Sequence, residues 1–450
     1  MIKKLLVANR GEIAVRIIRA AREMGIPTVA VFSEIDADSM HVRLADEAVC
    51  IGPAPSVKSY LVKPNVLMAA LSNGADAIHP GYGFLSENAE FVGLCEKEGI
   101  TFVGPSADAI DRMGNKAQAR ATAQAAGVPV VPGSDGVVET VDEARTFADA
   151  VGYPVLIKAS AGGGGKGMRV AQSADELEKQ FTAARTEAAA AFGNDEVYLE
   201  KYLARPRHIE FQVLADTHGN TVYLFERDCS VQRRHQKLIE EAPSPALTPA
   251  MRKEMGEAAV ALAQAVGYVG AGTVEFLLDT DGKFYFMEMN TRVQVEHPIT
   301  EQITGVDIIK EQLRIASGEP LSCANQDEIE LKGHSFEFRI NAEDPLHDFR
   351  PNPGRIEQLI LPGGFGVRVD THCYPGYLVP PTYDSMIAKL VTWGDTREEA
   401  LARGARALDE MVIDPIKTTI PFHRAAIKID DFVKGDVYTD FIDTHSIELE

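Results

Sequence analysis

Apolar runs alternate with amphipathic stretches through the first hundred residues of the chain. The predicted strands are residues 2–8, 28–32, 75–79 and 100–103, and the predicted helices are residues 11–24 and 87–97. Strands that alternate with helices in this way form a parallel sheet covered on both faces. The sequence therefore predicts an α/β domain here, although the turn Asn9-Arg10-Gly11-Glu12 lacks the three glycines of a dinucleotide-binding loop.

The rest of the chain mixes helices with strands less regularly. The predicted helices are residues 116–126, 174–191, 249–266 and 299–317, and the part from residue 331 opens with strands and closes with a helix at 397–411. The predicted strands are residues 155–159, a segment that ends at Glu200, and antiparallel strands within 207–238 and 271–289. This order adds an α+β part to the α/β beginning.

Composition and charge exclude several classes of protein. The chain has 450 residues, 45% of them hydrophobic, with 45 basic and 66 acidic side chains and a net charge of −21. Nucleic acid and anionic membranes are bound through basic faces, so neither is an expected partner. No apolar stretch approaches the ~20 residues of a membrane span, and the start lacks a secretory signal. Five scattered cysteines without a Cys-x-x-Cys pair fit a reducing compartment, and we expect a cytoplasmic location.

A glycine-rich run, Gly162-Gly163-Gly164-Gly165-Lys166-Gly167, follows one of the predicted strands. Such a run can be a flexible linker, but this one lies in a tight turn between strand-like segments. Glycines there let backbone N–H groups approach phosphate oxygens, and Lys158 or Lys166 supplies a point charge. A Walker A loop needs Ser or Thr after Gly-Lys, which is absent here. We interpret the run as a phosphate-binding loop of another kind.

An Asp-Gly pair at 281–282 predicts a two-residue hairpin in which Thr280 pairs with Lys283. This register places Glu275 opposite Glu288, in strands that are otherwise apolar. Two facing buried carboxylates repel each other, and a divalent cation with oxygen ligands, such as Mg²⁺, resolves the conflict. A slipped register with one glutamate in solvent, or a pair that shares one proton, explains the same sequence.

Polar and apolar residues alternate from the second glutamate onward. The polar members of this row are Glu288, Asn290, Arg292, Gln294 and Glu296. Period two puts them on one face of an extended segment. A solvated strand edge shows the same alternation, but the mixture of acids, amides and a cation favours a binding surface for a small anion. A straight segment would span ~26 Å, too far for one reaction centre, so we predict a bend before Glu296.

Two further polar segments have competing interpretations. His208-Ile209-Glu210 is similar to half of a zinc deaminase motif, but the Pro-Cys-x-x-Cys half is absent. The cationic segment Arg233-Arg234-His235-Gln236-Lys237 is short and lies in a strand-rich part of an acidic chain. We therefore interpret it as the lining of an anionic small-molecule site rather than as a nucleic-acid patch.

Several segments together resemble one family, the biotin carboxylases of the ATP-grasp superfamily. Besides the glycine run and Arg233-Arg234-His235-Gln236-Lys237, they are Ala8-Asn9-Arg10-Gly11-Glu12-Ile13-Ala14, His79-Pro80-Gly81-Tyr82-Gly83-Phe84-Leu85-Ser86-Glu87-Asn88, Glu240-Glu241-Ala242-Pro243, Glu288-Met289-Asn290-Thr291-Arg292-Val293-Gln294-Val295-Glu296-His297 and Arg339-Ile340-Asn341-Ala342-Glu343. The resemblance covers nearly the whole chain.

The resemblance implies an α/β and α+β architecture: an ATP-grasp fold with an N-terminal Rossmann-like, pre-ATP-grasp parallel-sheet domain and a C-terminal mixed α/β domain. The expected boundaries are 1–114 for the N-terminal domain, 115–330 for the ATP-grasp domain and 331–450 for the C-terminal domain. A mobile glycine-rich lid is expected at about 132–203. The family usually forms homodimers.

The resemblance also implies roles for individual residues. The expected ATP-binding residues are Lys116, Lys158, Gly163, Gly164, Gly165, Lys166, Glu200, Lys201, Leu203, His208 and His235. The expected ligands of Mg²⁺ or Mn²⁺ are Glu275, Glu288 and Asn290. The expected bicarbonate and biotin residues are Lys237, Arg292, Gln294, Val295, Glu296 and Arg339. Of these, Glu296 is the expected base, Arg339 lies beside the biotin ureido oxygen, and Arg292 and Lys237 complete the catalytic set.

The implied activity is that of a ligase: carboxylation of biotin by bicarbonate and ATP through carboxyphosphate. No Met-Lys-Met biotin-attachment motif is present, so biotin is expected on a separate biotin carboxyl carrier protein, with carboxyltransferase subunits as further partners. The complex would be acetyl-CoA carboxylase, which makes malonyl-CoA for fatty acid synthesis, or a pyruvate or propionyl-CoA carboxylase. A carbamoyl-phosphate synthetase relative, which should show tandem halves, and a non-catalytic ATP-binding module are the alternatives.

Overall fold

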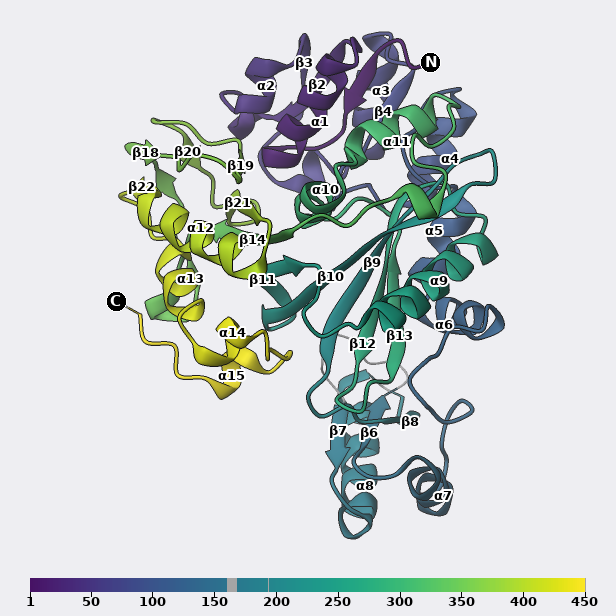
Figure 1. The fold of residues 1–450 in the computed structure, drawn as a ribbon. Coiled ribbons are helices and arrows are strands. Elements are labelled where there is room, and N and C mark those ends of the chain that lie inside the picture. Colours follow the sequence, from purple (N-terminus) through teal and green to yellow (C-terminus); the bar gives the residue numbers. More distant parts are fainter. Residues whose placement is uncertain (160–167, 193, 450) are drawn as a thin grey trace. The chain divides into compact units, whose positions relative to one another are not determined.

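The computed structural model describes residues 1–159, 168–192 and 194–449 (Figure 1). The chain divides into two compact units. The larger unit comprises Met1–Val128, Arg207–Phe276 and Glu288–Glu450, and the smaller unit comprises Pro129–Pro206 and Leu277–Met287. Among the helices of the described residues, none is long and apolar enough to cross a membrane.

A five-stranded parallel sheet begins the larger unit, in the order β3-β2-β1-β4-β5. Its strands are β1 (Leu5–Val7), β2 (Thr28–Ser33), β3 (Glu47–Gly52), β4 (Ala77–His79) and β5 (Thr101–Phe102). The helices of this region are α1 (Gly11–Glu23), α2 (Met40–Leu44), α3 (Lys63–Ser72), α4 (Ala89–Lys97), α5 (Ala107–Gly114) and α6 (Lys116–Ala125). Leu5 packs with Ile17 of α1, whereas Leu6 packs with Val66 of α3 on the other face. The predicted parallel sheet is confirmed, but the predicted set omits β3, although residues 48–51 form an apolar run.

A second sheet has eight strands in the order β13-β12-β9-β10-β11-β14-β21-β19. Its strands are β9 (Arg207–Ala215), β10 (Thr221–Arg233), β11 (Gln236–Ala242), β12 (Gly270–Leu278), β13 (Phe284–Asn290), β14 (His334–Asn341), β19 (Val367–Thr371) and β21 (Met386–Gly394). The pairings from β9 through β10, β11, β14 and β21 to β19 are antiparallel, as predicted for 207–238. Helix α9 (Pro249–Ala265) packs on β9 and β10.

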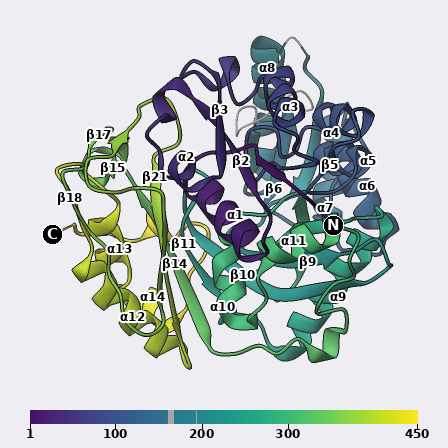
Figure 2. The ribbon, with the colours of Figure 1, turned by 90° about the horizontal axis from the view of Figure 1, so that it is seen from above.

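Two helices replace the single helix predicted at 299–317. They are α10 (His297–Thr304) and α11 (Ile308–Ala316), and α11 lies beside α1 (Figure 2). Gly305 ends α10 in the left-handed conformation (φ 72°), and the Asp307 side chain caps α11 by accepting a hydrogen bond from the Lys310 N–H at 3.0 Å. The apolar period runs through both helices, which is why the pattern alone did not show the break.

Strand β14 separates two kinds of side chain by its period of two. Phe336 and Phe338 lie in an apolar core with residues of α12 (Arg397–Glu410), which packs on β14 and β21 (Figure 1). Gly404 of α12 comes so close that a Cβ atom there would lie 2.9 Å from the Phe338 ring. Glu337 and Arg339 point to the opposite face, on which α10 packs. One strand therefore contributes to a core on one side and to an ionic cluster on the other.

The larger unit ends in small sheets and short helices. The sheets pair β15 (Glu343–Asp344) with β16 (Arg350–Pro351), β17 (Gly354–Arg355) with β20 (Leu378–Val379), and β18 (Gln358–Ile360) with β22 (Val412–Asp414). The helices after α12 are α13 (Ile420–Ala426), α14 (Asp430–Lys434) and α15 (Phe441–Thr444). The predicted helix at 397–411 is confirmed as α12, but the prediction that it closes the chain is wrong. Helices of seven, five and four residues are too short to show a helical period.

The smaller unit contains a three-stranded antiparallel sheet in the order β7-β6-β8. Its elements are β6 (Val155–Ala159), β7 (Met168–Ala171), β8 (Val197–Lys201), α7 (Val141–Val151) and α8 (Ala174–Phe192). Alternate residues of β6, Val155 and Ile157, are fully buried against α7 and α8. Thr140 and Glu143 form a capping box that starts α7. The strand and helix predicted at 155–159 and 174–191 are confirmed.

Candidate active site

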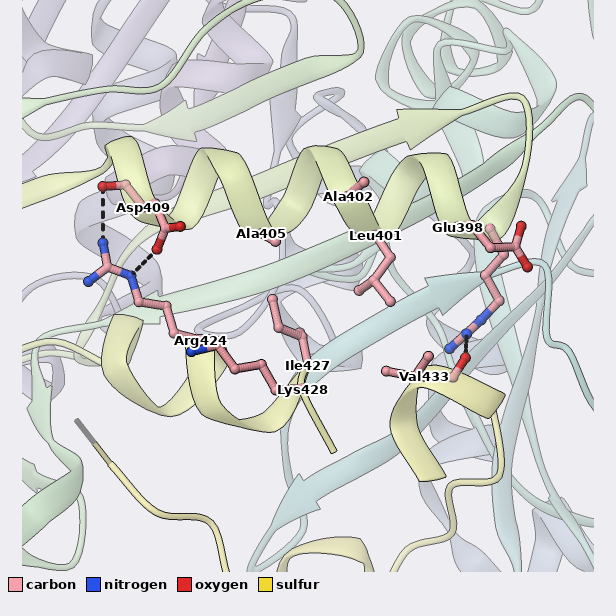
Figure 3. A pocket seen from close by; sticks show the side chains of 10 residues that line it. Glu398, Leu401, Ala402, Ala405, Asp409, Arg424, Ile427, Lys428 and Val433 are labelled. Carbon is pink, nitrogen blue, oxygen red and sulfur yellow. Dashed lines mark hydrogen bonds and ion pairs between the residues drawn. The ribbon is translucent and has the colours of Figure 1, made fainter. Parts of the chain in front are cut away.

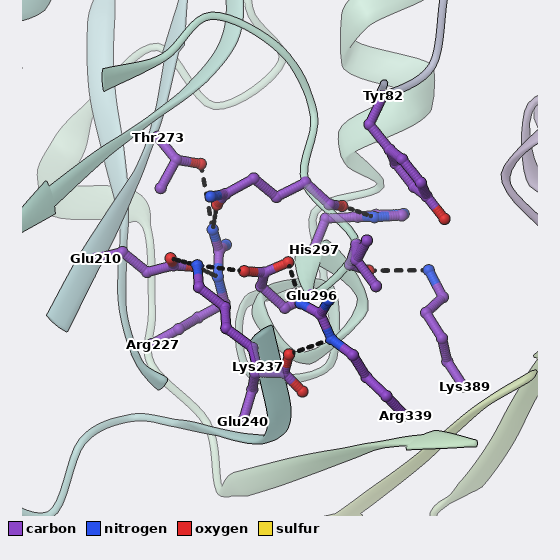
Figure 4. A network of polar contacts seen from close by, with 12 residues as sticks. Tyr82, Glu210, Arg227, Lys237, Glu240, Thr273, Glu296, His297, Arg339 and Lys389 are labelled. Carbon is purple, nitrogen blue, oxygen red and sulfur yellow. Dashed lines mark hydrogen bonds and ion pairs between the residues drawn. The ribbon is translucent and has the colours of Figure 1, made fainter. Parts of the chain in front are cut away.

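The ammonium group of Lys237 lies among three carboxylates of the larger unit (Figure 4). From β11, its Nζ donates to Glu210 Oε2 at 2.5 Å, to Glu296 Oε1 at 2.7 Å and to Glu275 Oε1 at 3.0 Å. Burial lowers the pKa of Lys237, but the three carboxylates outweigh burial and hold this pKa well above its usual range. Lys237 therefore stays protonated and offsets part of the charge of an acidic cluster.

Glu296 stands where the chain turns into α10. It is the N-cap residue of α10, with φ −79° and ψ 7°, so the row of polar residues bends before it, as predicted. Burial raises the pKa of Glu296, but Lys237, Arg339 and Arg227 together hold it well below its usual range. Glu296 is therefore an ionised carboxylate whose oxygens are bonded to two cations.

Arg339 projects from β14 between two carboxylates (Figure 4). Its Nε donates to Glu240 Oε1 at 2.5 Å, and one terminal nitrogen donates to Glu296 Oε2 at 3.1 Å. The Thr419 hydroxyl donates to the Arg339 carbonyl oxygen at 2.8 Å, which fixes the backbone. A planar, permanently charged group held in this way directs its remaining N–H groups into a defined position.

Arg227, which is fully buried, supports the cluster from β10. Its guanidinium donates to Glu210 Oε1 and Gln294 Oε1 at 2.6 Å, to Gln212 Oε1 and Thr300 Oγ1 at 2.9 Å, and to Thr273 Oγ1 at 3.2 Å. This set uses acceptors from four different elements. Arg227 thus fixes the carboxylate of Glu210 and the amide of Gln294 in place.

The hairpin between β12 and β13 closes differently from the prediction. The Asp279 N–H donates to the Lys283 carbonyl at 2.8 Å, and the Gly282 N–H donates to the Asp279 carbonyl at 3.0 Å. The turn thus has three residues, with Gly282 at φ 82°, and the predicted pairing of Thr280 with Lys283 is wrong. A three-residue turn with a left-handed glycine is the alternative to a two-residue loop. Pairing continued from this turn would place Met287, not Glu288, opposite Glu275.

Glu275 and Glu288 nevertheless interact within the larger unit. Burial and then the charge of Glu275 raise the pKa of Glu288, against the opposing effect of Lys116. Glu275 itself accepts hydrogen bonds from Lys237 Nζ, from Asn290 Nδ2 at 2.9 Å and from Gln294 Nε2 at 2.8 Å, and its Oε2 lies 2.9 Å from His208 Nε2. Burial raises the pKa of Glu275, but Lys237 and His208 hold it well below its usual range. A buried carboxylate repelled by its neighbour, beside an amide, fits a divalent cation with oxygen ligands.

Arg292 joins the row of polar residues to the N-terminal part of the larger unit. Its Nε donates to Glu87 Oε2 at 2.9 Å, and a terminal nitrogen donates to Asn290 Oδ1 at 2.8 Å. Asn290 and Gln294 both donate to Glu275. The alternating row therefore folds onto one acid rather than lying along a straight edge.

Two left-handed residues form the turn between β10 and β11. Arg234 has φ 49° and the exposed His235 has φ 65°, the backbone of a two-residue turn that usually favours Asn and Gly. The Asp348 carboxylate accepts hydrogen bonds from Arg233 and, at 3.1 Å, from Arg234. These ion pairs hold the turn that carries His235.

The smaller unit contains its own group of predicted ATP-binding residues. Lys158 of β6 forms an ion pair with Glu200 of β8. Lys201 lies opposite Val155 in the same sheet, and Leu203 is buried. The predicted residues Gly163, Gly164, Gly165 and Lys166 lie outside the described residues.

Comparisons with known proteins decide the family. Residues 1–110 match the biotin carboxylase N-terminal domain, residues 115–324 match the ATP-binding domain of the carbamoyl-phosphate synthase L chain, and residues 337–444 match the biotin carboxylase C-terminal domain. Biotin carboxylase 1 of Bacillus subtilis is 59% identical over 448 residues, 99% of each chain. The chain belongs to the biotin carboxylase family.

Relatives with other names and solved structures agree with this assignment. A pyruvate carboxylase subunit of Methanothermobacter thermautotrophicus is 56% identical over 99% of this chain and 90% of its own. The biotin carboxylase subunit of a pyruvate carboxylase matches with a TM-score of 0.92 at 51% identity over all of both chains. The biotin carboxylase domain dimer of Hydrogenobacter thermophilus 2-oxoglutarate carboxylase, solved with MgADP, ADP and bicarbonate, matches with a TM-score of 0.89 at 51% identity over 99% and 98% of the chains. The ATP-grasp architecture with a parallel-sheet N-terminal domain is thereby shown.

In this biotin carboxylase, the residues predicted from the sequence fall into separate groups. The larger unit brings together Lys237, Glu275, Asn290, Arg292, Gln294, Glu296, Arg339 and His208, with Glu288 beside Glu275. Val295 contributes its carbonyl oxygen, which accepts a hydrogen bond from Lys389 Nζ at 2.9 Å. Lys116 is the exposed first residue of α6, and His235 is at the tip of the β10–β11 turn.

Sequence reasoning assigned no role to several residues of the cluster. They are Glu87, Glu210, Arg227, Glu240, Glu337 and Lys389. Most of them are fully buried ionisable groups inside strands whose neighbours are apolar, such as Glu337 between Phe336 and Phe338. A charged residue at an interior strand position was the available signal, because burying a charge without partners is unfavourable.

A cavity of about 340 Å³ lies elsewhere on the larger unit, beside α12, α13 and α14 (Figure 3). Its lining includes Leu401, Ala405 and Ile427. The cations at its rim already have partners, since Arg397 donates to Glu241 Oε2 at 2.8 Å and Arg424 donates to the Leu408 carbonyl at 2.7 Å. The groups suited to the chemistry of a biotin carboxylase lie instead around Lys237.

Proposed function

We propose that this chain carboxylates biotin with bicarbonate and ATP, and releases ADP and phosphate. The observation that carries the proposal is the Glu296 carboxylate bonded to both Lys237 and Arg339. The reaction needs a base for bicarbonate, a point charge near the phosphates and a permanent cation near biotin. These three residues supply one group of each kind, within hydrogen-bonding distance of one another.

In the first step, Glu296 accepts the proton of bicarbonate, and the resulting oxyanion attacks the γ-phosphorus of ATP, from which ADP leaves. The low pKa of Glu296 comes from its bonds to Lys237 and Arg339, so bicarbonate must take over those bonds before the proton moves. Lys237 and Arg292 then face the developing negative charge. Glu275 and Glu288, with Asn290 nearby, would hold Mg²⁺ or Mn²⁺, which supplies positive charge to phosphate oxygens when bound.

In the second step, carboxyphosphate breaks down to CO₂ and phosphate. The phosphate removes the N1′ proton of biotin, and the nitrogen of the resulting enolate form attacks CO₂ to give carboxybiotin. Arg339 stabilises the negative ureido oxygen, because its charge does not depend on pH and its orientation is set by Glu240. Gln294 and Val295 complete the bicarbonate-binding surface.

We further propose the ATP-binding set and the domain boundaries given by the family resemblance. Glu200, Lys201 and Leu203 contact adenine, and Lys116, Lys158, His208, His235 and the glycine run contact the phosphates. The domains comprise residues 1–114, 115–330 and 331–450. A lid at about 132–203 is supported by the compactness of the unit that contains Pro129–Pro206.

Phosphate release by the purified full chain tests the function. With Mg-ATP and bicarbonate, free biotin should stimulate release, and carboxybiotin should form from labelled bicarbonate. Stimulation by ammonia instead of biotin would point to carbamoyl-phosphate chemistry. ATP binding without any bicarbonate-dependent release would point to a non-catalytic ATP-binding module, and either result would overturn the proposal.

The partners we propose are a biotin carboxyl carrier protein, carboxyltransferase subunits and a second copy of this chain, in the cytoplasm. Relatives named biotin carboxylase support acetyl-CoA carboxylase as the assembled enzyme, and the relative from a pyruvate carboxylase makes pyruvate the competing acceptor. Reconstitution with the carrier and transferase subunits, followed by assays with each acceptor, separates these assignments.

A further inference from the structure

Two glutamates face each other across β11 and β14, behind Arg339. The strand register pairs Glu240 directly with Glu337. Residues paired in this way have Cβ atoms ~4.5–5.5 Å apart on one face of the sheet. Both side chains have no exposed surface. Two acids are thus held close together in a place that water does not reach.

The oxygens of this pair lack hydrogen-bond donors. Glu240 Oε1 accepts from Arg339 Nε at 2.5 Å, but Glu240 Oε2 has no partner among the described residues. The same holds for both oxygens of Glu337. An ionised carboxylate buried without donors is strongly unfavourable. A proton on one of the two acids would remove one charge and provide an O–H donor to the other acid.

The cations around the pair are already bonded to other acids. Arg339, on β14, is shared between Glu240 and Glu296, the latter at the start of α10. Lys389, on β21, lies 3.1 Å from Glu12 Oε2 of α1 and faces Asp370 of β19. The remaining cation near the pair is Lys237 of β11, bonded to Glu210, Glu275 and Glu296. No cation in the described part of the chain forms an ion pair with Glu337.

We propose that Glu240 and Glu337 hold one proton between them, and that this proton makes Glu337 a positioning residue for Arg339. With the proton present, the pair carries a single negative charge on the oxygen that faces Arg339. Without it, the second charge draws the guanidinium toward Glu337 and away from Glu296, to which its bond is the longer one. The presence of the proton rests on the geometry of the pair, and its importance for biotin rests on the proposed function.

The charges nearby agree with a retained proton. Burial is the main cause that raises the pKa of each acid, and the charge of Glu240 further raises the pKa of Glu337. Lys389 opposes this effect at Glu337, and Arg339 opposes it at Glu240. Since a raised pKa favours the neutral acid, the shared proton is present at low pH and is lost as the pH rises.

Infrared spectroscopy of the purified full chain near neutral pH tests the proton itself, with no substrate needed. The carbonyl band of protonated carboxylic acids should lose the intensity of one acid in Glu337→Gln. Glu241→Gln is the matched control, because Glu241 is the neighbour of Glu240, is buried and is bonded to His334 and Arg397. That control should leave the band unchanged. An unchanged band in Glu337→Gln would overturn the proposal, whether or not the chain carboxylates biotin.

Kinetics test the positioning role. Glu337→Gln keeps a neutral donor for Glu240, whereas Glu337→Leu removes it, so Glu337→Leu should raise the KM for free biotin roughly 10- to 100-fold by misplacing Arg339. Glu337→Gln should raise it several-fold less and should shift the loss of biotin-dependent activity to higher pH. Equal effects of both substitutions with an unchanged pH profile would reduce Glu337 to a structural role. A wild-type chain without biotin-dependent activity would overturn the proposed function but not the shared proton.

Discussion

The two faces of the sheet around β14 differ in every respect except their backbone. Phe336 and Phe338 lie in an apolar core against α12, and the residues that alternate with them, Glu337 and Arg339, lie in a buried ionic cluster toward α10. The first face stabilises the fold through burial of apolar area. The second concentrates charges whose desolvation opposes folding. Neighbouring residues in one strand therefore serve stability and chemistry separately.

This separation has a physical reason. A side chain on the apolar face is fixed by close packing, and its replacement leaves a cavity that changes the free energy of unfolding. A side chain on the ionic face is fixed by directional bonds to Lys237, Arg339 or Arg227, so its replacement changes the charge presented to a substrate. The apolar face also keeps β14 rigid, which functional groups on a scaffold require.

The largest effect is expected for Glu296→Gln, which removes the base but keeps the shape of the side chain. Bicarbonate-dependent phosphate release should fall roughly 10²- to 10⁴-fold, since this is the usual contribution of a general base. ATP binding, measured by calorimetry, should persist. Glu301→Gln in the same helix is the control, because Glu301 bonds to Arg16 and Arg368 instead of Lys237. Equal losses of turnover in both variants would show that any acid of α10 matters alike.

Phe338→Ala should affect stability instead of chemistry. Truncation of this fully buried ring should lower the free energy of unfolding by about 3–5 kcal/mol. Turnover per folded molecule should stay near that of the wild type, as measured below the unfolding transition. Phe338→Leu, which leaves a smaller cavity, serves as the milder comparison. A fall in turnover similar to that of Glu296→Gln would break the separation of the two faces.

Glu240 and Glu241 are neighbours on opposite faces and should give pH effects of opposite sign. Burial raises the pKa of Glu240 to about 7, so its contribution to stability is present at low pH and is lost as the pH rises from about 4.5 toward 7. At Glu241 burial is outweighed by His334 and Arg397, which lower the pKa, so its contribution is lost as the pH falls below about 4.5. Urea unfolding across pH should show that Gln at 240 and Gln at 241 remove slopes of opposite sign, each on the order of 1 kcal/mol. Slopes of the same sign would contradict the assignment of the two faces.

The smallest effect is expected at the exposed end of the ionic region. Asp348→Asn should weaken the ion pairs that hold the Arg234-His235 turn, at a cost of only about 0.2–1 kcal/mol, because Asp348 is 71% exposed. The KM for ATP should rise more than kcat falls, and the difference should shrink at high salt. Asp344→Asn, which alters the nearby bond to His347, is the control. A salt-independent loss of kcat would show that the turn acts in another way.

The amount that the sequence predicts follows the range of the interactions. Local patterns predict the parallel sheet, α12 and the bend at Glu296, because periodicity and capping act over a few residues. Pattern alone does not predict the break at Gly305, where two helices share one apolar period, or the three-residue turn that ends at Gly282. The partners of Lys237 come from Glu210, Glu275 and Glu296, and no local pattern connects such distant residues. The resemblance to a family supplied most of those positions, but not Arg227 or the pairing of Glu240 with Glu337.

Gly404 has a consequence for engineering. A methyl group there would meet the Phe338 ring at 2.9 Å, so any larger residue must push α12 and β14 apart. Arg339 follows Phe338 in the same strand and holds Glu296 by a bond of 3.1 Å, which tolerates displacements of only ~0.5 Å. The thickness of the helix layer on one side of the sheet thus sets the mechanical tolerance of the reaction centre on the other side. Attempts to stabilise α12 by replacing its glycine with alanine should therefore be judged by biotin kinetics as well as by melting temperature.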